Sequence, residues 1–126
     1  MKTAWIVDDD SEMSQAVGLM LKLLGFATRT FLDARSAAKA LLSGQRPEVL
    51  LLDIQMPQVS GLDLLGFLRQ RPEFKYLPII MLTSEAADVM VDTALAMGAD
   101  AYLTKPLALE ELEATLRRVL PLYGKA

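Results

Sequence analysis

The sequence contains no cysteine and no histidine among its 126 residues. Without cysteine it can form no disulfide, offers no thiol nucleophile and cannot bind zinc or an iron–sulfur cluster through sulfur. Without histidine it has no imidazole for acid–base catalysis or for metal binding. Any nucleophile must therefore be Asp, Glu, Ser, Thr, Lys or Tyr, and any bound metal must accept oxygen ligands, as Mg²⁺ and Ca²⁺ do.

Long apolar runs and long runs of like charge are also missing. No apolar stretch reaches the roughly 18 residues of a membrane-spanning helix, and the first residues lead into an aspartate cluster, unlike a signal peptide. With 13 basic and 16 acidic residues the formal net charge is −3, which argues against direct binding to nucleic-acid phosphates or anionic lipid. We therefore expect a cytoplasmic protein without direct nucleic-acid or membrane contacts.

Length and composition predict a single domain. A chain of 126 residues with 52% hydrophobic residues can bury a full apolar core without disulfides or metals. No linker, internal repeat or low-complexity segment interrupts it. We therefore expect one domain over residues 1–126, with a core from about 3 to 120.

Short apolar runs alternate with amphipathic patterns along the chain. The apolar runs lack polar alternation, as strands covered on both faces by helices do. They are Ala4–Val7, Phe26–Thr30, Val49–Leu52, Ile79–Leu82 and Ala101–Leu103. Helical periodicity is found at about 13–24, 34–42, 61–69, 91–95 and 109–120. This alternation indicates an α/β fold, a doubly wound five-stranded parallel sheet with five helices on its two faces.

Reactive side chains follow four of the five predicted strands, at the sheet edge where ligands bind in such folds. They are Asp8, Asp9 and Asp10, then Asp53, then Thr83 and Ser84, then Thr104 and Lys105. Two carboxylates about 4 Å apart repel by roughly 4 kcal/mol at an effective dielectric constant near 20. A divalent cation or an ammonium group would relieve this repulsion. Asp10 is the exception, because it fits best as the N-cap of the first helix.

Together these groups describe a phosphoryl-transfer site. An open site with two or three carboxylates suits Mg²⁺. Asp53 can act as a nucleophile. The metal and Lys105 would neutralise charge on the transferring group, and Thr83 would donate a hydrogen bond to a phosphoryl oxygen.

Four motifs, in this order and strand context, resemble the receiver domain of response regulators in two-component signalling, of the chemotaxis-regulator-like kind. They are Val7-Asp8-Asp9, Asp53-Ile54-Gln55-Met56-Pro57 with Gly61, Leu82-Thr83-Ser84, and Tyr102-Leu103-Thr104-Lys105-Pro106. The resemblance runs from about Thr3 to Leu120. It implies a flavodoxin-like sheet with strand order 2-1-3-4-5 and a cis Lys105-Pro106 bond.

The resemblance also implies roles for single residues. Asp53 would be the phospho-acceptor. Asp8 and Asp9 would bind Mg²⁺ together with Asp53 and the backbone carbonyl of Gln55. Lys105 would pair with the phosphoryl oxygens.

A second group of residues would respond to the phosphoryl group rather than hold the metal. Thr83 would contact it and Tyr102 would change rotamer with Thr83, so that the two form a switch. Gln55 and Glu85 would flank the attacking water and tune hydrolysis. On the fourth helix we expect Val91, Ala94 and Leu95 to face inward and Val89 and Met90 outward, in a partner surface shared with Tyr102.

The leading functional hypothesis is a phosphorylation-controlled switch. A sensor histidine kinase or histidine phosphotransfer protein would phosphorylate Asp53, and the face formed by the fourth helix, fifth strand and fifth helix would bind an effector or a second copy. The chain would not be an enzyme beyond assisting its own phosphorylation and autodephosphorylation. One alternative is a receiver-like interaction module independent of phosphorylation. Another is a Mg²⁺-dependent aspartyl phosphatase, disfavoured because Gln55 stands where such enzymes have a second acid.

Overall fold

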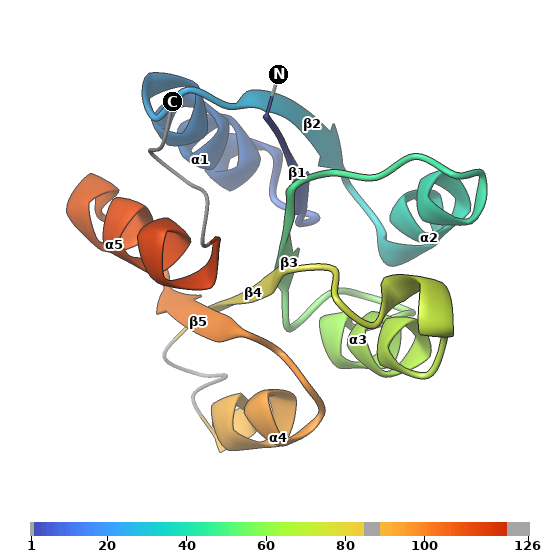
Figure 1. Cartoon of the computed structure of the whole chain (residues 1–126). Coiled ribbons are helices and arrows are strands. Elements are labelled where there is room, and N and C mark those ends of the chain that lie inside the picture. Colours follow the sequence, from blue (N-terminus) through green and yellow to red (C-terminus); the bar gives the residue numbers. More distant parts are fainter. Residues whose placement is uncertain (1, 85–88, 121–126) are drawn as a thin grey trace.

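The computed structural model describes residues 2–84 and 89–120 and shows a five-stranded parallel sheet between two layers of helices (Figure 1). The strands are β1 (Thr3–Val7), β2 (Ala27–Phe31), β3 (Val49–Asp53), β4 (Ile79–Thr83) and β5 (Ala101–Thr104). The helices are α1 (Ser11–Leu23), α2 (Ala34–Leu42), α3 (Gly61–Arg69), the 3₁₀ turn η1 (Pro72–Phe74), α4 (Val91–Ala96) and α5 (Leu109–Val119). The strand order β2-β1-β3-β4-β5 confirms the predicted flavodoxin-like fold.

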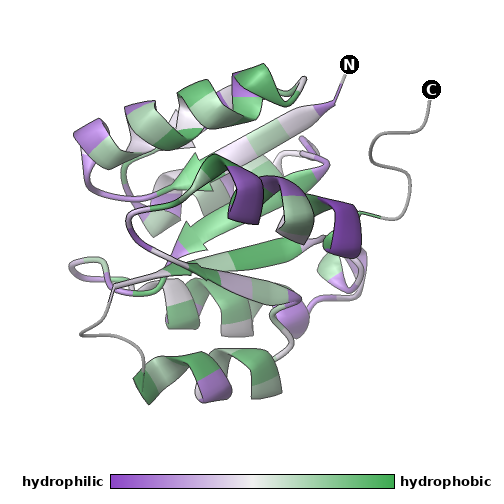
Figure 2. Ribbon diagram, turned by 90° about the vertical axis from the view of Figure 1, so that its left-hand side faces the viewer, coloured by the Kyte–Doolittle hydropathy of each residue, from purple (hydrophilic) through white to green (hydrophobic). Residues whose placement is uncertain are grey.

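The core forms two layers because successive side chains of a strand point to opposite faces. Leu50 and Leu52 of β3 join the layer covered by α2, α3 and α4, whereas Val49 and Leu51 join the layer covered by α1 and α5. Figure 2 shows the central strands in hydrophobic colours and the outer side of α5 as hydrophilic. Burial on both faces explains why the apolar runs show no alternation.

The parallel register aligns the carboxyl ends of neighbouring strands. Val7 pairs with Phe31 on one side and Leu52 on the other, Asp53 pairs with Leu82, and Thr83 pairs with Thr104. The carboxyl ends of all five strands therefore meet at one edge of the sheet, as the sequence predicted. No helix among the described residues is long and apolar enough to cross a membrane.

Side-chain caps fix where the helices begin. The Asp10 side chain accepts a hydrogen bond from the Met13 backbone N–H (3.1 Å), which confirms its predicted role as the N-cap of α1. At α3, Ser60 and Asp63 form a reciprocal capping box, with N–O distances of 3.1 and 3.2 Å. These caps anchor the loops that carry the strand-end residues.

The fourth helix departs from its expected orientation. Val91 and Ala94 are buried and Val89 is exposed, as predicted. Leu95, however, is 40% exposed, and Met90 is half-buried against the core. A helix of six residues has room for one buried row, here positions 91 and 94. The assignment of Leu95 to the inner face and of Met90 to the surface was therefore wrong.

Arg69 connects three segments around the start of β4. Its Nε donates to the Gly98 carbonyl (2.9 Å), its Nη1 to the Phe74 carbonyl (2.8 Å), and its Nη2 pairs with Asp100 Oδ2 (3.1 Å). The same Asp100 oxygen accepts a hydrogen bond from the Ile79 backbone N–H (2.8 Å). Arg69 thus links the end of α3 to η1 and to the turn before β5.

We expect Arg69→Met to lower the free energy of unfolding by about 2 kcal/mol or more, because three acceptors lose a charged donor. Urea unfolding followed by circular dichroism measures this. Arg71→Met is the matched control, since the Arg71–Glu73 pair is exposed on both sides and should contribute much less to stability. Equal losses in the two variants would contradict a structural role specific to Arg69.

Candidate functional site

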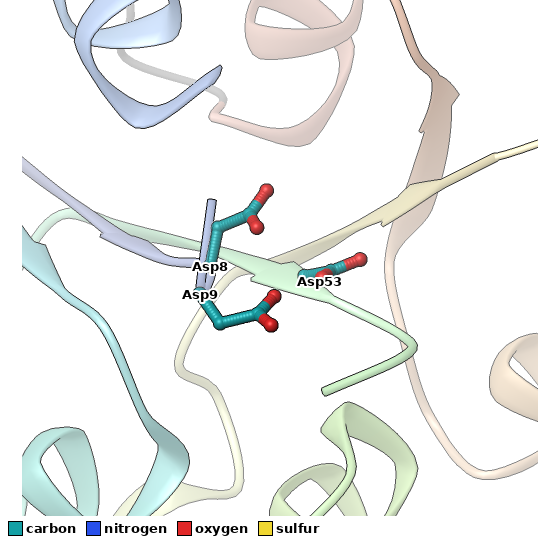
Figure 3. A group of neighbouring side chains, drawn as sticks. All are labelled: Asp8, Asp9 and Asp53. Carbon is teal, nitrogen blue, oxygen red and sulfur yellow. The ribbon is translucent and has the colours of Figure 1, made fainter. Parts of the chain in front are cut away.

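Three carboxylates and one ammonium group meet at the carboxyl edge of the sheet. Asp8 and Asp9 follow β1, Asp53 ends β3, and Lys105 follows β5. One oxygen from each carboxylate lies within 4.8 Å of the others. Figure 3 shows the three side chains directed to the same side of the strand ends. The convergence predicted from the strand ends is therefore present.

Lys105 sits between two of these carboxylates. Its Nζ lies 2.7 Å from Asp8 Oδ2 and 3.2 Å from Asp53 Oδ1. Asp8 is completely buried, and its Oδ2 forms an ion pair with Lys105. Its other oxygen accepts the Asp10 backbone N–H at 3.0 Å. Lys105 therefore supplies the positive charge that this buried acid requires.

The buried setting shifts the acidity of Asp53. Burial, followed by the nearby charge of Asp8, raises the pKa of Asp53 to about 6, although Lys105 and the backbone N–H of Gln55 act in the opposite direction. Burial works to lower the pKa of Lys105, but its contacts with Asp8 and Asp53 outweigh burial and raise that pKa. At neutral pH most Asp53 side chains are thus ionised, beside a protonated Lys105.

Four further residues were predicted to belong to the site, namely Thr83, Tyr102, Gln55 and Glu85. Thr83 is buried at the end of β4, and its hydroxyl donates to the Ser84 carbonyl (3.0 Å) rather than to Asp53. Tyr102 on β5 is 45% exposed and borders a surface hollow together with Glu111 and Arg118 of α5. The Gln55 side chain is exposed. Glu85 lies outside the described residues.

Two backbone features of the site were not predicted. The Gln55 N–H acts on the Asp53 carboxylate, where the sequence had suggested a role for the Gln55 carbonyl. Gly61 at the start of α3 approaches the backbone of Asp53 so closely that a Cβ there would lie 1.9 Å from the Asp53 carbonyl oxygen. The Gln55 contact is made by a backbone N–H, so residue type gives no signal for it. The glycine at 61 was a signal, since a close approach of two backbones requires a residue without a Cβ. The expected cis Lys105-Pro106 bond is present.

The donor set fits a hard divalent cation. All three candidate ligands are carboxylates, Asp9 is exposed to solvent, and Asp8 and Asp53 are buried beside it. Mg²⁺ prefers oxygen ligands and keeps several waters, which an open site with one exposed carboxylate allows. The acidic group could therefore hold Mg²⁺.

Comparison with known proteins agrees with this geometry. Residues 4–117 match the model of the response regulator receiver domain. The chain is 38% identical over 115 residues to the phosphate regulon transcriptional regulatory protein PhoB of Rhizobium meliloti, covering 91% of this chain and 50% of that protein. It is 35% identical over 119 residues to the DNA-binding transcriptional regulator NtrC of Proteus hauseri, covering 94% and 24%. The chain thus spans half or less of these curated relatives.

Solved structures show the same fold over nearly the whole chain. The chemotaxis protein CheY4 of Vibrio cholerae has a TM-score of 0.84 and 35% identity, covering 95% of this chain and 99% of that one. The receiver domain of NtrX from Brucella abortus has a TM-score of 0.85 and 28% identity, covering 94% and 98%. The chain belongs to the receiver domain family of two-component response regulators. Domains of this family act as signalling switches rather than as enzymes, and they typically bind Mg²⁺.

Proposed function

We propose that this chain is a phosphorylation-controlled switch whose phospho-acceptor is Asp53. The observation that carries the proposal is the Lys105 ammonium held between Asp8 and Asp53, 2.7 and 3.2 Å away, beside a third carboxylate at one sheet edge. This edge offers a nucleophile, a fixed cation and oxygen ligands for a metal, which are the parts that phosphoryl transfer uses.

In the proposed reaction, an Asp53 carboxylate oxygen attacks the phosphorus of a phosphohistidine. The oxygen–phosphorus bond forms as the phosphorus–nitrogen bond breaks, and the imidazole leaves. Because these 126 residues include no histidine, the phosphohistidine would lie outside them, in a sensor histidine kinase or a histidine phosphotransfer protein. In the metal-free protein, burial and the Asp8 charge raise the pKa of Asp53 to about 6, so Asp53 is mostly ionised at neutral pH.

Asp8, Asp9, Asp53 and the backbone carbonyl of Gln55 would hold Mg²⁺, which when bound neutralises charge on the phosphoryl oxygens. Lys105, already in contact with Asp53, would pair with a phosphoryl oxygen after transfer. Gln55 and Glu85 would flank the attacking water and set the rate at which the phosphoryl group is lost. The chain would catalyse no reaction beyond its own phosphorylation and this hydrolysis.

The response would begin at Thr83. Its buried hydroxyl donates to the Ser84 carbonyl, and this neutral hydrogen bond is worth about 1 kcal/mol. Donation to a charged phosphoryl oxygen is roughly twice as strong, so phosphorylation would draw the hydroxyl toward Asp53. Tyr102 would change rotamer with it and shift the population toward an active face.

The active face would comprise α4, β5 and α5. Exposed apolar side chains lie just before α4, on α4 and on β5, namely Val89, Leu95 and Tyr102. In Figure 2, α4 is the lowest helix and is mainly hydrophobic in colour. A surface of this kind suits an effector or a second copy of the chain. In relatives named as transcriptional regulators, the remaining half or more of the protein could be such an effector.

Incubation with acetyl phosphate and Mg²⁺, followed by intact-mass measurement, tests the proposal. We expect wild type to gain one phosphoryl group, Asp53→Ala to gain none, and Asp10→Ala to behave as wild type because Asp10 only caps α1. No gain on wild type would favour a module independent of phosphorylation. Equal gain on Asp53→Ala would exclude Asp53 as the acceptor, and multiple-turnover release of phosphate from a phosphomonoester would indicate a phosphatase.

A further inference from the structure

A cavity of about 480 Å³ lies at the amino edge of the sheet, opposite Asp53. Its lining includes Lys2, Glu48 and Pro78, which directly precede β1, β3 and β4. Each of these strands has five residues, and strands rise about 3.3 Å per residue. The cavity is therefore separated from the phosphoryl site by roughly 16 Å of sheet and is independent of it.

The wall of this cavity is mostly apolar. Its apolar lining includes three prolines and two leucines, namely Pro47, Pro72, Pro78, Leu77 and Leu120. Tyr76 also lines it, although its side chain is 85% exposed. Prolines and a tyrosine present flat, stiff surfaces, which suit the face of a planar ring. The volume lies within the range of small-molecule sites, about 300–1,000 Å³.

A fixed guanidinium group stands at the rim. Arg46 packs over the ring of Phe74, 4.4 Å from its centroid, and its Nη1 donates to the Leu41 and Gln45 carbonyls at 2.6 and 2.8 Å. These contacts hold the group flat and use one nitrogen. In the described part of the chain no hydrogen bond uses its Nε or Nη2, so that edge can still donate two parallel bonds.

Two basic and two acidic residues line the cavity, Lys2 and Arg46 against Glu48 and Glu73. The acid Glu73 is already matched by Arg71, whose Nη2 lies 2.7 Å from it. The charge of Arg46 also helps to lower the pKa of Glu73. Arg46 could serve solely to cap the end of α2, but that role uses only Nη1 and explains neither the exposed tyrosine nor the apolar hollow beside it.

We propose that this cavity binds a small aromatic carboxylate. The ring would lie on Tyr76 and the adjacent prolines, and the carboxylate would accept two bonds from the free edge of Arg46. Paired N–H donors in a plane match a carboxylate better than any other common anion except phosphate, and the apolar wall favours a ring over inorganic phosphate.

Titration of ¹⁵N-labelled protein with 1-naphthoate, followed by ¹H–¹⁵N NMR, tests this proposal. We expect saturable shifts at the amides of Glu48, Glu73 and Leu77, with those of Asp9 and Asp53 unchanged. Arg46→Gln should weaken binding about tenfold, the loss of a charge-assisted bond. Arg35→Gln, a change of the same kind at an exposed position on α2, should have no effect.

Two further binding measurements test the proposal even if Arg46→Gln disturbs the end of α2. Tyr76→Ser alters a side chain with little packing and should also weaken binding, and 1-naphthalenemethanol should bind much more weakly than 1-naphthoate. The proposal is overturned if no shifts saturate, if the shifts fall around Asp53, or if Tyr76→Ser and the alcohol both bind as wild type and acid do. Asp53→Ala should bind normally, so this outcome is independent of the phosphorylation test.

Discussion

Gly61→Ala is expected to lower the free energy of unfolding by about 3 kcal/mol or more. The added Cβ would lie 1.9 Å from the carbonyl oxygen of Asp53, 2.8 Å from its carbonyl carbon and 3.0 Å from Ile54 Cα. All three are backbone atoms at the end of β3, so no side chain can rotate away. The start of α3 would have to move off the strand and lose the hydrogen bond from the Gly61 N–H to the Ile54 carbonyl (2.9 Å).

Chemical unfolding monitored by circular dichroism measures this loss. Gly18→Ala is the matched control, because its new Cβ would meet only side-chain atoms at 3.8 Å within α1. Replacing a glycine inside a helix should stabilise by about 0.5–1 kcal/mol. We also expect Gly61→Ala to be phosphorylated more slowly by acetyl phosphate, since the displaced backbone carries Asp53. A Gly61→Ala variant as stable as wild type would show that α3 can shift at no cost.

The sheet could be predicted from the sequence because its signals are local. The runs at 49–52 and 79–82 are entirely apolar since both faces of β3 and β4 are buried. Parallel strands then bring their carboxyl ends together, which predicted Asp8, Asp53 and Lys105 as neighbours before any coordinates. The strand order itself came with the family resemblance, since alternation alone leaves several orders possible.

Features that depend on contacts between distant segments were not predictable. The Thr83 hydroxyl could equally have turned toward Asp53, and only the packed structure selects the Ser84 carbonyl. Gly61 was one member of a motif, but its closeness to Asp53 reflects how α3 packs on β3. The orientation of Leu95 was predicted wrongly for a related reason, since periodicity over one and a half turns cannot define a face.

Asp53→Asn is expected to raise the free energy of unfolding at pH 7 by on the order of 2–3 kcal/mol when no metal is present. The pKa of Asp53 is raised from 3.8 to about 6 in the folded protein. Between these values the folded state binds more protons than the unfolded state, so wild-type stability falls as pH rises from about 4 to 6. Above pH 6 the full penalty of the buried charge is present, and the neutral amide avoids it.

Urea unfolding of both proteins in EDTA, from pH 4 to pH 8, measures the difference. It should be greatest above pH 6 and vanish near pH 4, and Mg²⁺ should reduce it by stabilising wild type. Asp33→Asn is the control with the opposite sign, because a hydrogen bond from the Ser36 backbone lowers the pKa of Asp33. The ionised Asp33 side chain therefore stabilises wild type above the unfolded pKa, so Asp33→Asn should be less stable than wild type there. This contribution is lost as the pH falls.

Two outcomes would contradict a destabilising charge on Asp53. Wild type and Asp53→Asn could be equally stable at pH 7, or their difference in free energy of unfolding could stay constant down to pH 4. This prediction links stability to the proposed function. The burial and the Asp8 charge that destabilise the metal-free protein belong to the site where Asp53 would accept the phosphoryl group. Binding of Mg²⁺ would then relieve a repulsion that folding alone leaves in place. The amide variant would be the more stable protein and would have lost the acceptor.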